Sequence, residues 1–211
     1  KKAVIVVTAN RGLAGGYNSN ITRMIIDEGF TKENTVVYAV GKKGRELLER
    51  KGYEIKADYS EAINDPIYKD AKEICDDVLS AFADGEVGEI YLAYTVFKNT
   101  VVHEPQLIRL LPVEADDAAH ETDGSEALMT YEPSEEEALD MIIPKYVCSL
   151  VYGALIKSVA SENGARMQAM DSATSNAEEM ISTLSLKYNR ARQASITQEL
   201  TEIIAGANAI E

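Results

Sequence analysis

The chain has no tryptophan and only two histidines, two cysteines and five prolines among its 211 residues. Cys75 and Cys148 are too few and too widely spaced for the disulfide framework of a small secreted domain, so we expect two reduced core thiols. His103 and His120 lie in no metal-ligand spacing, and no metal site is predicted. No Ser or Cys nucleophile has a plausible base near it in sequence, so we predict no catalytic residue.

Positive charge is also scarce, because 21 Lys and Arg residues face 35 Asp and Glu, a formal net charge of −14. A nucleic-acid-binding protein would carry a basic patch, so no nucleic-acid partner is expected. The same balance argues against a polybasic membrane-surface protein. No contiguous apolar run approaches the roughly 18–20 residues that cross a bilayer.

Hydrophobic residues make up 45% of the chain, enough for a real core. In the first half, short apolar runs rich in β-branched residues alternate with helical patterns. Strands are expected at 3–8, 35–40, 53–56, 89–97 and 100–111, and helices at 19–29, 42–51 and from 65 onward. The last two strands, joined by Lys98-Asn99, are expected to form an antiparallel hairpin. This order predicts an α/β fold with a mostly parallel, Rossmann-like sheet and flanking helices over residues 1–111.

A glycine-rich turn follows the first predicted strand, where dinucleotide-binding turns occur. Its glycines, Gly12, Gly15 and Gly16, satisfy neither the dinucleotide fingerprint nor the phosphate-loop pattern. The acidic residue expected after the second strand is missing too, because Gly41 to Gly44 stand there. Glycines that permit a tight turn and close helix–sheet packing explain the motif without a cofactor. A nucleotide-binding Rossmann-like enzyme stays open as the alternative function.

Residues 112–133 are crowded with acidic side chains and show little periodicity, so we expect a flexible, solvated loop. Ser134 and Glu137 have the form of a capping box that begins a helix. Residues 134–211 then show apolar side chains at spacings of three or four, which predicts one long helix. Pro144 is expected to kink it near its start. The apolar stripe comprises Leu139, Ile143, Tyr146, Leu150, Gly153, Ile156, Ala160, Met167, Met170, Thr174, Ala177, Ile181, Leu184, Tyr188 and Ala191.

Such a helix is longer than the predicted domain is wide. At ~1.5 Å per residue it would span about 100 Å, whereas a domain of this size has a radius of gyration of about 13 Å. We therefore expect the helix to project and its stripe to pair in a coiled coil. No other segment is long enough, so the partner is expected to be a second helix that precedes Lys1 and is missing from this sequence. Without it, the exposed stripe is expected to make the chain self-associate, fold back or partly melt. An unrelated coiled-coil adaptor remains a further alternative.

Two segments resemble the gamma subunit of the F-type ATP synthase. Arg11–Asn18 resembles the turn after that family's first strand, and Tyr188–Ile203 is similar to its C-terminal signature almost residue for residue. Ala160–Ala173 also fits, and the resemblance covers the whole chain. The family's N-terminal helix has no counterpart here.

The resemblance implies a non-catalytic rotor that couples ion-driven rotation of the c-subunit ring to ATP synthesis in the beta subunits. Two antiparallel helices would form a coiled coil inside a hexamer of alpha and beta subunits. The α/β domain would form the foot, against the c ring and the epsilon subunit. The location would be peripheral, on the cytoplasmic face of a bacterial inner membrane.

Four residues of the long helix match family positions that contact partners. Arg192, Gln193 and Thr197 match residues that hydrogen-bond a loop of the catalytic beta subunits, and Arg166 matches a rotor arginine nearer the foot. At 100° per residue, the first three fall within about 140° of one helical face. Spacing alone is equally compatible with a solvated polar face.

Overall fold

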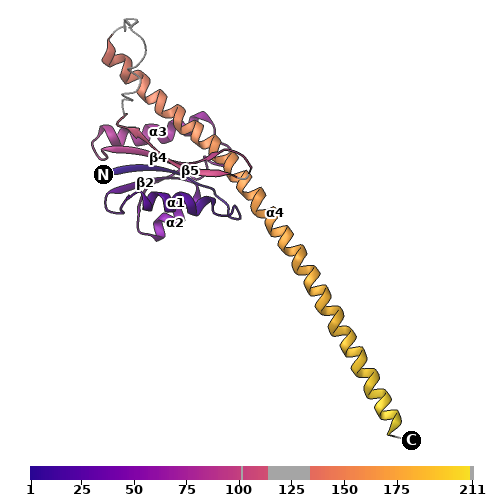
Figure 1. Ribbon diagram of the computed structural model, residues 1–211. Helices are drawn as coiled ribbons and strands as arrows, with labels where there is room; N and C mark the ends of the chain where they lie inside the picture. Colours follow the sequence, from indigo (N-terminus) through magenta and orange to yellow (C-terminus); the bar gives the residue numbers. More distant parts are fainter. Residues whose placement is uncertain (101, 114–133, 210–211) are drawn as a thin grey trace, which may run out of the picture. The chain divides into compact units, whose positions relative to one another are not determined.

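The computed structural model describes residues 1–100, 102–113 and 134–209 (Figure 1). The chain forms two compact units, Lys1–Gln168 and Ala169–Glu211. The first contains the sheet, its flanking helices and the first part of α4 (Glu135–Asn208), and the second contains the rest of α4. Residues 114–133, which make up most of the predicted acidic loop and include His120, lie outside the described residues.

A five-stranded sheet with the order β3-β2-β1-β4-β5 organises the first unit. Its strands are β1 (Lys2–Val7), β2 (Thr35–Val40), β3 (Glu54–Asp58), β4 (Glu89–Phe97) and β5 (His103–Leu111). The first four are parallel and β5 runs antiparallel to β4. The predicted mostly parallel sheet and its hairpin are therefore confirmed. The central strands β1 and β2 are buried on both faces, which explains their continuous apolar sequences.

The hairpin turn is longer than the two residues that the sequence suggested. The N–H groups of Lys98 and Asn99 donate to the Val102 carbonyl, and the Asn99 side chain accepts the Val102 N–H at 2.7 Å. β5 therefore begins at His103 and not at Thr100.

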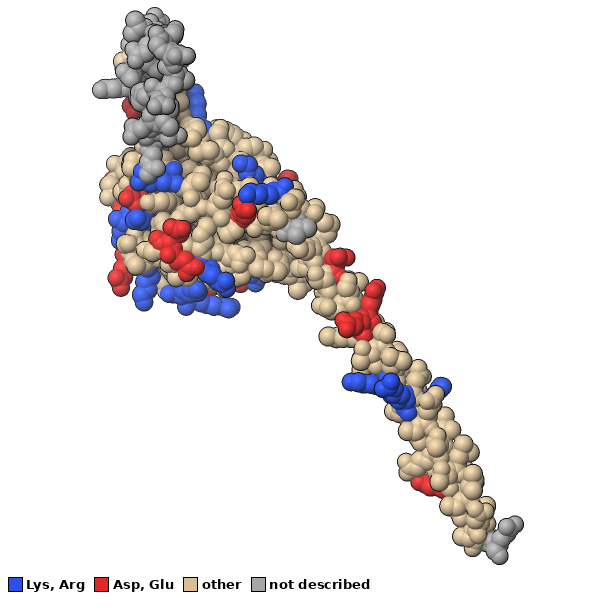
Figure 2. Space-filling model, viewed as in Figure 1, with Lys and Arg blue, Asp and Glu red and all other residues tan. Residues whose placement is uncertain are grey.

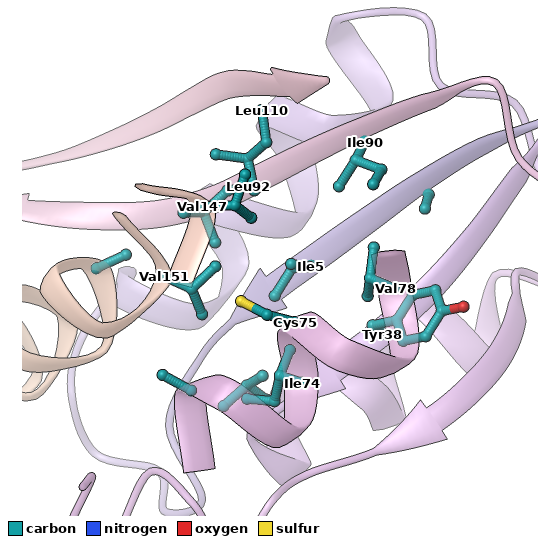
Figure 3. Close-up of a cluster of buried hydrophobic side chains, with 14 of the residues drawn as sticks. Ile5, Tyr38, Ile74, Cys75, Val78, Ile90, Leu92, Leu110, Val147 and Val151 are labelled. Carbon is teal, nitrogen blue, oxygen red and sulfur yellow. The ribbon is translucent and has the colours of Figure 1, made fainter. Parts of the chain in front are cut away.

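Helices cover both faces of the sheet. α1 (Tyr17–Asp27) and α2 (Lys42–Arg50) pack on one face, where the core contains Val4, Val6, Ile21, Ile25 and Leu48. α3 (Tyr68–Ala83) and the first part of α4 pack on the other (Figures 1 and 3), where it contains Ile5, Val7, Ile74, Val78, Val147, Val151 and Leu155. Successive β1 side chains enter opposite cores because side chains alternate along a strand.

The long C-terminal helix is confirmed as one element, α4, which continues on both sides of Pro144. At its start, the Ser134 hydroxyl accepts the Glu137 N–H at 3.2 Å, the first half of the predicted capping box. The predicted apolar stripe needs a correction, because it mixes residues of two helix faces. Its members Ile143 and Leu150 pack against the sheet core, whereas its member Tyr146 is exposed, as is Ile142, which the stripe did not include. A helix with two apolar faces contains several spacings of three or four, and spacing alone does not separate them.

The expectation about membrane-spanning segments also needs a correction. Within Glu137–Asn208, one 18-residue window has a mean hydropathy of 1.5, with 28% of it buried, and is apolar enough to cross a membrane by length and composition. Contiguous apolar runs in this helix are short, whereas an average over 18 residues tolerates interspersed polar residues. A helix that packs on a sheet meets the same test, and Val147, Val151 and Leu155 of α4 pack in this way.

Candidate partner-binding surface

The crevice at the carboxyl ends of β1 and β4 is filled by the protein itself. Tyr17 is buried, packs with Ala9, Ala14 and Ala165, and donates its hydroxyl proton to the Ser158 carbonyl at 3.0 Å. Nucleotides bind at this kind of crevice in open α/β sheets, where the strand order reverses. Here the position is occupied by Tyr17 and the turn of α4 that carries Ser158.

The amino end of α2 is likewise occupied by the chain. The N–H of Lys42 donates to the Asn10 side chain at 2.9 Å, that of Lys43 to the Ala9 carbonyl at 3.0 Å, and that of Gly44 to the Thr8 hydroxyl at 2.9 Å. Such N–H groups hold phosphates in nucleotide sites. A Cβ at Gly44 would lie 2.5 Å from the Thr8 hydroxyl oxygen, so this glycine permits close packing. This geometry disfavours the nucleotide-binding alternative.

Arg166 lies in the first unit, in a polar cleft of about 380 Å³. Its guanidinium is partly buried and pairs with Glu162 one helical turn earlier, with 2.5 Å between Nη2 and Oε1. The cleft is also lined by Asn10, Arg11, Ile63, Asn64, Val159 and Asn163. Arg11, from the glycine-rich turn, has no ion-pair partner in the described part of the chain. The structure therefore brings two arginines that are far apart in sequence to one cleft.

The tip of the glycine-rich turn holds an exposed apolar side chain. Leu13 is 75% exposed and has a φ of 64°, in the left-handed region that non-glycine residues rarely adopt. Backbone conformations of this kind persist where the surroundings enforce them, often at functional sites. Sequence reasoning missed Arg11 and Leu13 as site residues, although a cation and a large apolar side chain among glycines could have drawn attention to them.

Arg192, Gln193 and Thr197 lie in the second unit, where every described side chain from Met170 onward is exposed. The Thr197 hydroxyl donates to the Gln193 carbonyl at 2.8 Å, and Arg192 has no ion pair among the described residues. The three side chains share one helical face, whereas Arg166 belongs to the other unit.

The same face carries apolar side chains that the sequence analysis did not include. At 100° per residue, Ile196, Leu200, Ile203 and Ile204 fall within the same arc of about 140° as the three polar residues, and each is about half exposed or more. A second arc, centred about 120° away from the first, carries the earlier exposed side chains Ile181, Leu184 and Tyr188. Most of the exposed apolar surface of α4 therefore changes position near residue 195, and Leu186, 58% exposed, already lies on the later arc. Figure 2 shows mostly uncharged surface in this unit.

Comparison with known proteins places the chain in a family. The family described as ATP synthase matches residues 1–210. The ATP synthase gamma chain of Lachnoclostridium phytofermentans is 68% identical over 216 residues, which cover 100% of this chain and 74% of that one. The sodium-ion-specific gamma chain of Acetobacterium woodii is 42% identical, covering 100% and 75%. The chain belongs to the ATP synthase gamma family.

Gamma chains are central-stalk subunits of ATP synthase and are non-catalytic, because catalysis takes place in the beta subunits. The fold of this chain also recurs in solved structures. A chain of the Euglena gracilis mitochondrial ATP synthase superposes with a TM-score of 0.71 at 19% identity, covering 99% of this chain and 72% of that one. A chain in the structure of the central stalk and c ring of the Tetrahymena thermophila mitochondrial ATP synthase gives a TM-score of 0.64 at 24% identity, covering 82% of this chain and 76% of that one.

Proposed function

We propose that this gamma chain is a torque-transmitting shaft. It couples rotation of the membrane c ring, driven by ion flow, to conformational change and ATP synthesis in the catalytic beta subunits. The observation that carries this proposal is the single helix α4, which exposes apolar side chains on two different arcs. Each arc requires its own partner.

The first surface is a heptad seam on α4. Positions spaced alternately by three and four residues, with Ile142 in place of Ile143, carry mostly apolar side chains from Leu139 to Ala191, the pattern of coiled-coil core positions. Its polar members include Ser149, Asn163 and Thr174. The large apolar members are exposed in both units, for example Ile142 in the first and Leu184 in the second. Gly153 and Ala160 are small and would let a second helix approach closely. This pattern supports the proposed antiparallel coiled coil with a second helix of the same subunit.

The seam also supports the prediction that the chain self-associates when that helix is missing. Ile181, Leu184 and Tyr188 are each more than 60% exposed, and monomers rarely expose long contiguous apolar stripes. A second copy would cover the same seam. Light scattering that shows only monomers, together with full helicity by circular dichroism, would contradict this part of the proposal.

The second surface is the C-terminal arc of α4, with Arg192, Gln193 and Thr197 beside Ile196 and Leu200. A guanidinium next to amide and hydroxyl groups suits the carboxylates and carbonyls of a loop. We propose that this arc contacts the beta-subunit loop and the surrounding alpha and beta subunits, because its apolar residues lie off the coiled-coil seam.

The foot of the shaft provides further contacts. We propose that Arg166, with Arg11 in the same cleft, binds acidic side chains of a catalytic beta-subunit loop. Glu162 neutralises part of the charge of Arg166, which leaves Arg11 to supply the excess positive charge. The α/β domain is proposed to contact the c ring and the epsilon subunit, on the cytoplasmic face of a bacterial inner membrane.

The coupling mechanism follows from the asymmetry of the helix. Three equivalent catalytic subunits around one shaft each meet a different arc of α4, so each gains a different contact free energy. A ligand shifts a conformational equilibrium only by its differential affinity for the two states. Rotation of the shaft moves these differences from one subunit to the next and drives each site through tight and open states.

The double substitution Arg192→Ala with Gln193→Ala tests the C-terminal arc. A hydrogen bond to a charged group contributes about 1.5–3 kcal/mol, so we expect roughly a tenfold or larger loss of rotation-coupled ATP synthesis in the reconstituted complex. Lys187→Ala is the matched control, because Lys187 is exposed and lies on neither arc. Unchanged synthesis in the double variant would show that the assigned contact is wrong.

A calorimetric titration with ATP and with NAD tests the enzyme alternative. We expect no heat of binding from either ligand, because Tyr17 fills the crevice and the α2 amides already have acceptors. Saturable binding at the crevice would favour the alternative.

A further inference from the structure

Each of the two helices on one face of the sheet contributes a cysteine to the same apolar cluster. Cys75 of α3 is fully buried and Cys148 of α4 is 4% exposed, and both are free thiols. Figure 3 shows the Cys75 sulfur directed toward α4 beside Val151. Cys148 precedes Val151 by three residues, so the two side chains lie on the same side of α4.

The two thiols belong to one buried cluster between α3 and α4. Burial, and secondly the Cys148 thiol, raise the pKa of the Cys75 thiol. Tyr68 at the start of α3 packs edge-on against Tyr152 of α4, with 5.9 Å between ring centroids. This ring contact fixes α3 and α4 side by side at the turn of α4 that follows Cys148.

We propose that Cys75 and Cys148 form a latent disulfide pair that, when oxidised by a low-molecular-weight disulfide, joins the first turns of α4 to α3. The inference concerns the first unit alone and does not depend on the proposed function. Neither cysteine belongs to the seam or to the C-terminal arc.

The chemistry proceeds by two thiol–disulfide exchanges. The Cys148 thiol, the less deeply buried one, loses its proton and attacks a sulfur of the small disulfide, which forms a mixed disulfide and releases one small thiol. The Cys75 thiol then loses its proton and attacks the Cys148 sulfur, which releases the second small thiol. Two protein thiols are thereby oxidised to one disulfide, and one small disulfide is reduced to two thiols.

Local opening of α4 controls the rate of this reaction. The thiolate is the reacting species, and burial of Cys75 suppresses it in the closed structure. The turns before Cys148 are weakly held, since Met141, Ile142, Lys145 and Tyr146 are all exposed. Segments with few buried contacts open most easily. Once formed, the disulfide prevents this local opening, so oxidising conditions would hold the first turns of α4 against α3.

The test uses the 211-residue chain treated with oxidised glutathione without denaturant, then alkylated and analysed by mass spectrometry. We expect the loss of two hydrogen atoms, a non-reduced peptide that joins Cys75 to Cys148, and a Tm higher by roughly 10 °C. Cys75→Ala and Cys148→Ala should each abolish all three changes.

Three outcomes would overturn the proposal: glutathione adducts on both cysteines without an internal bond, disulfide-linked dimers in place of it, or no reaction over several days. Phenylarsine oxide gives a second measurement, because one arsenic atom bridges only adjacent thiols. Stoichiometric binding that both alanine variants lose supports the proposal, whereas absence of binding contradicts it.

Discussion

Replacing glycine by alanine at two positions of α4 in the first unit should change the stability of the chain in different ways. A Cβ at Gly164 would lie 2.7 Å from Cε1 of His103 and 3.1 Å from Cε2 of Phe97, in the β4–β5 hairpin. The His103 ring is held by the Phe97 ring, with centroids 5.6 Å apart, and by a 3.3 Å contact with the Thr100 carbonyl. A Cβ at Gly153 would meet nothing within 4 Å.

The expected magnitudes follow from two opposing effects. Replacing glycine by alanine inside a helix stabilises it by about 1 kcal/mol, and Gly153→Ala should show the full gain. Adding a methyl group to a packed contact costs about 1–3 kcal/mol, so Gly164→Ala should be neutral or destabilising by up to ~2 kcal/mol. The two variants should therefore differ by about 1–3 kcal/mol, or roughly 2–12 °C in Tm.

Urea unfolding followed by circular dichroism and tyrosine fluorescence measures this difference. Removing the obstructing ring in the double variant Gly164→Ala with His103→Ala should restore part of the helical gain, which a double-mutant cycle isolates. If Gly164→Ala stabilised the chain as much as Gly153→Ala does, the hairpin would not constrain α4 at this point and the reasoning would be refuted.

Two further predictions concern the core and its pH dependence. Leu155→Ala, in the fully buried cluster on the α4 side of the sheet, should cost about 2–5 kcal/mol of unfolding free energy. Lys187→Ala, at an exposed position off both arcs, should change it by less than about 0.5 kcal/mol; equal urea midpoints would contradict this. Burial raises the pKa of Tyr17 and Tyr59, so above pH ~10 the folded chain keeps protons that the unfolded chain loses, and stability should fall as the pH rises further. The double variant Tyr17→Phe with Tyr59→Phe should lose less stability between about pH 9 and 11, roughly the range in which free tyrosine titrates. If it lost as much stability as the unchanged chain, the two tyrosines would not be the cause.

The sheet was predictable because its central strands carry their burial in their composition. Runs such as Val4 to Val7 suit only a strand covered on both faces, and the helices between them follow from spacing. The end of the hairpin was not predictable, because the Asn99 side chain extends the turn through a bond to the Val102 N–H. No local pattern indicates that bond.

The candidate site was predictable only in part. Arg192, Gln193 and Thr197 lie close together in sequence, so their shared face follows from helix geometry, and the shift of the apolar arc near residue 195 could have been found in the same way. The cleft that joins Arg11 to Arg166 could not, because it depends on how α4 packs on the sheet across more than 150 intervening residues. The assignment of Ile143 and Leu150 was wrong for the same reason.

Tyr17 and the turn of α4 around Ser158 take the position that a dinucleotide would occupy in a metabolic enzyme of similar architecture. A domain completed by its own side chains needs no dissolved metabolite to reach its finished, rigid form. In the proposed function, this domain would therefore transmit torque in the same way at low and at high nucleotide concentrations.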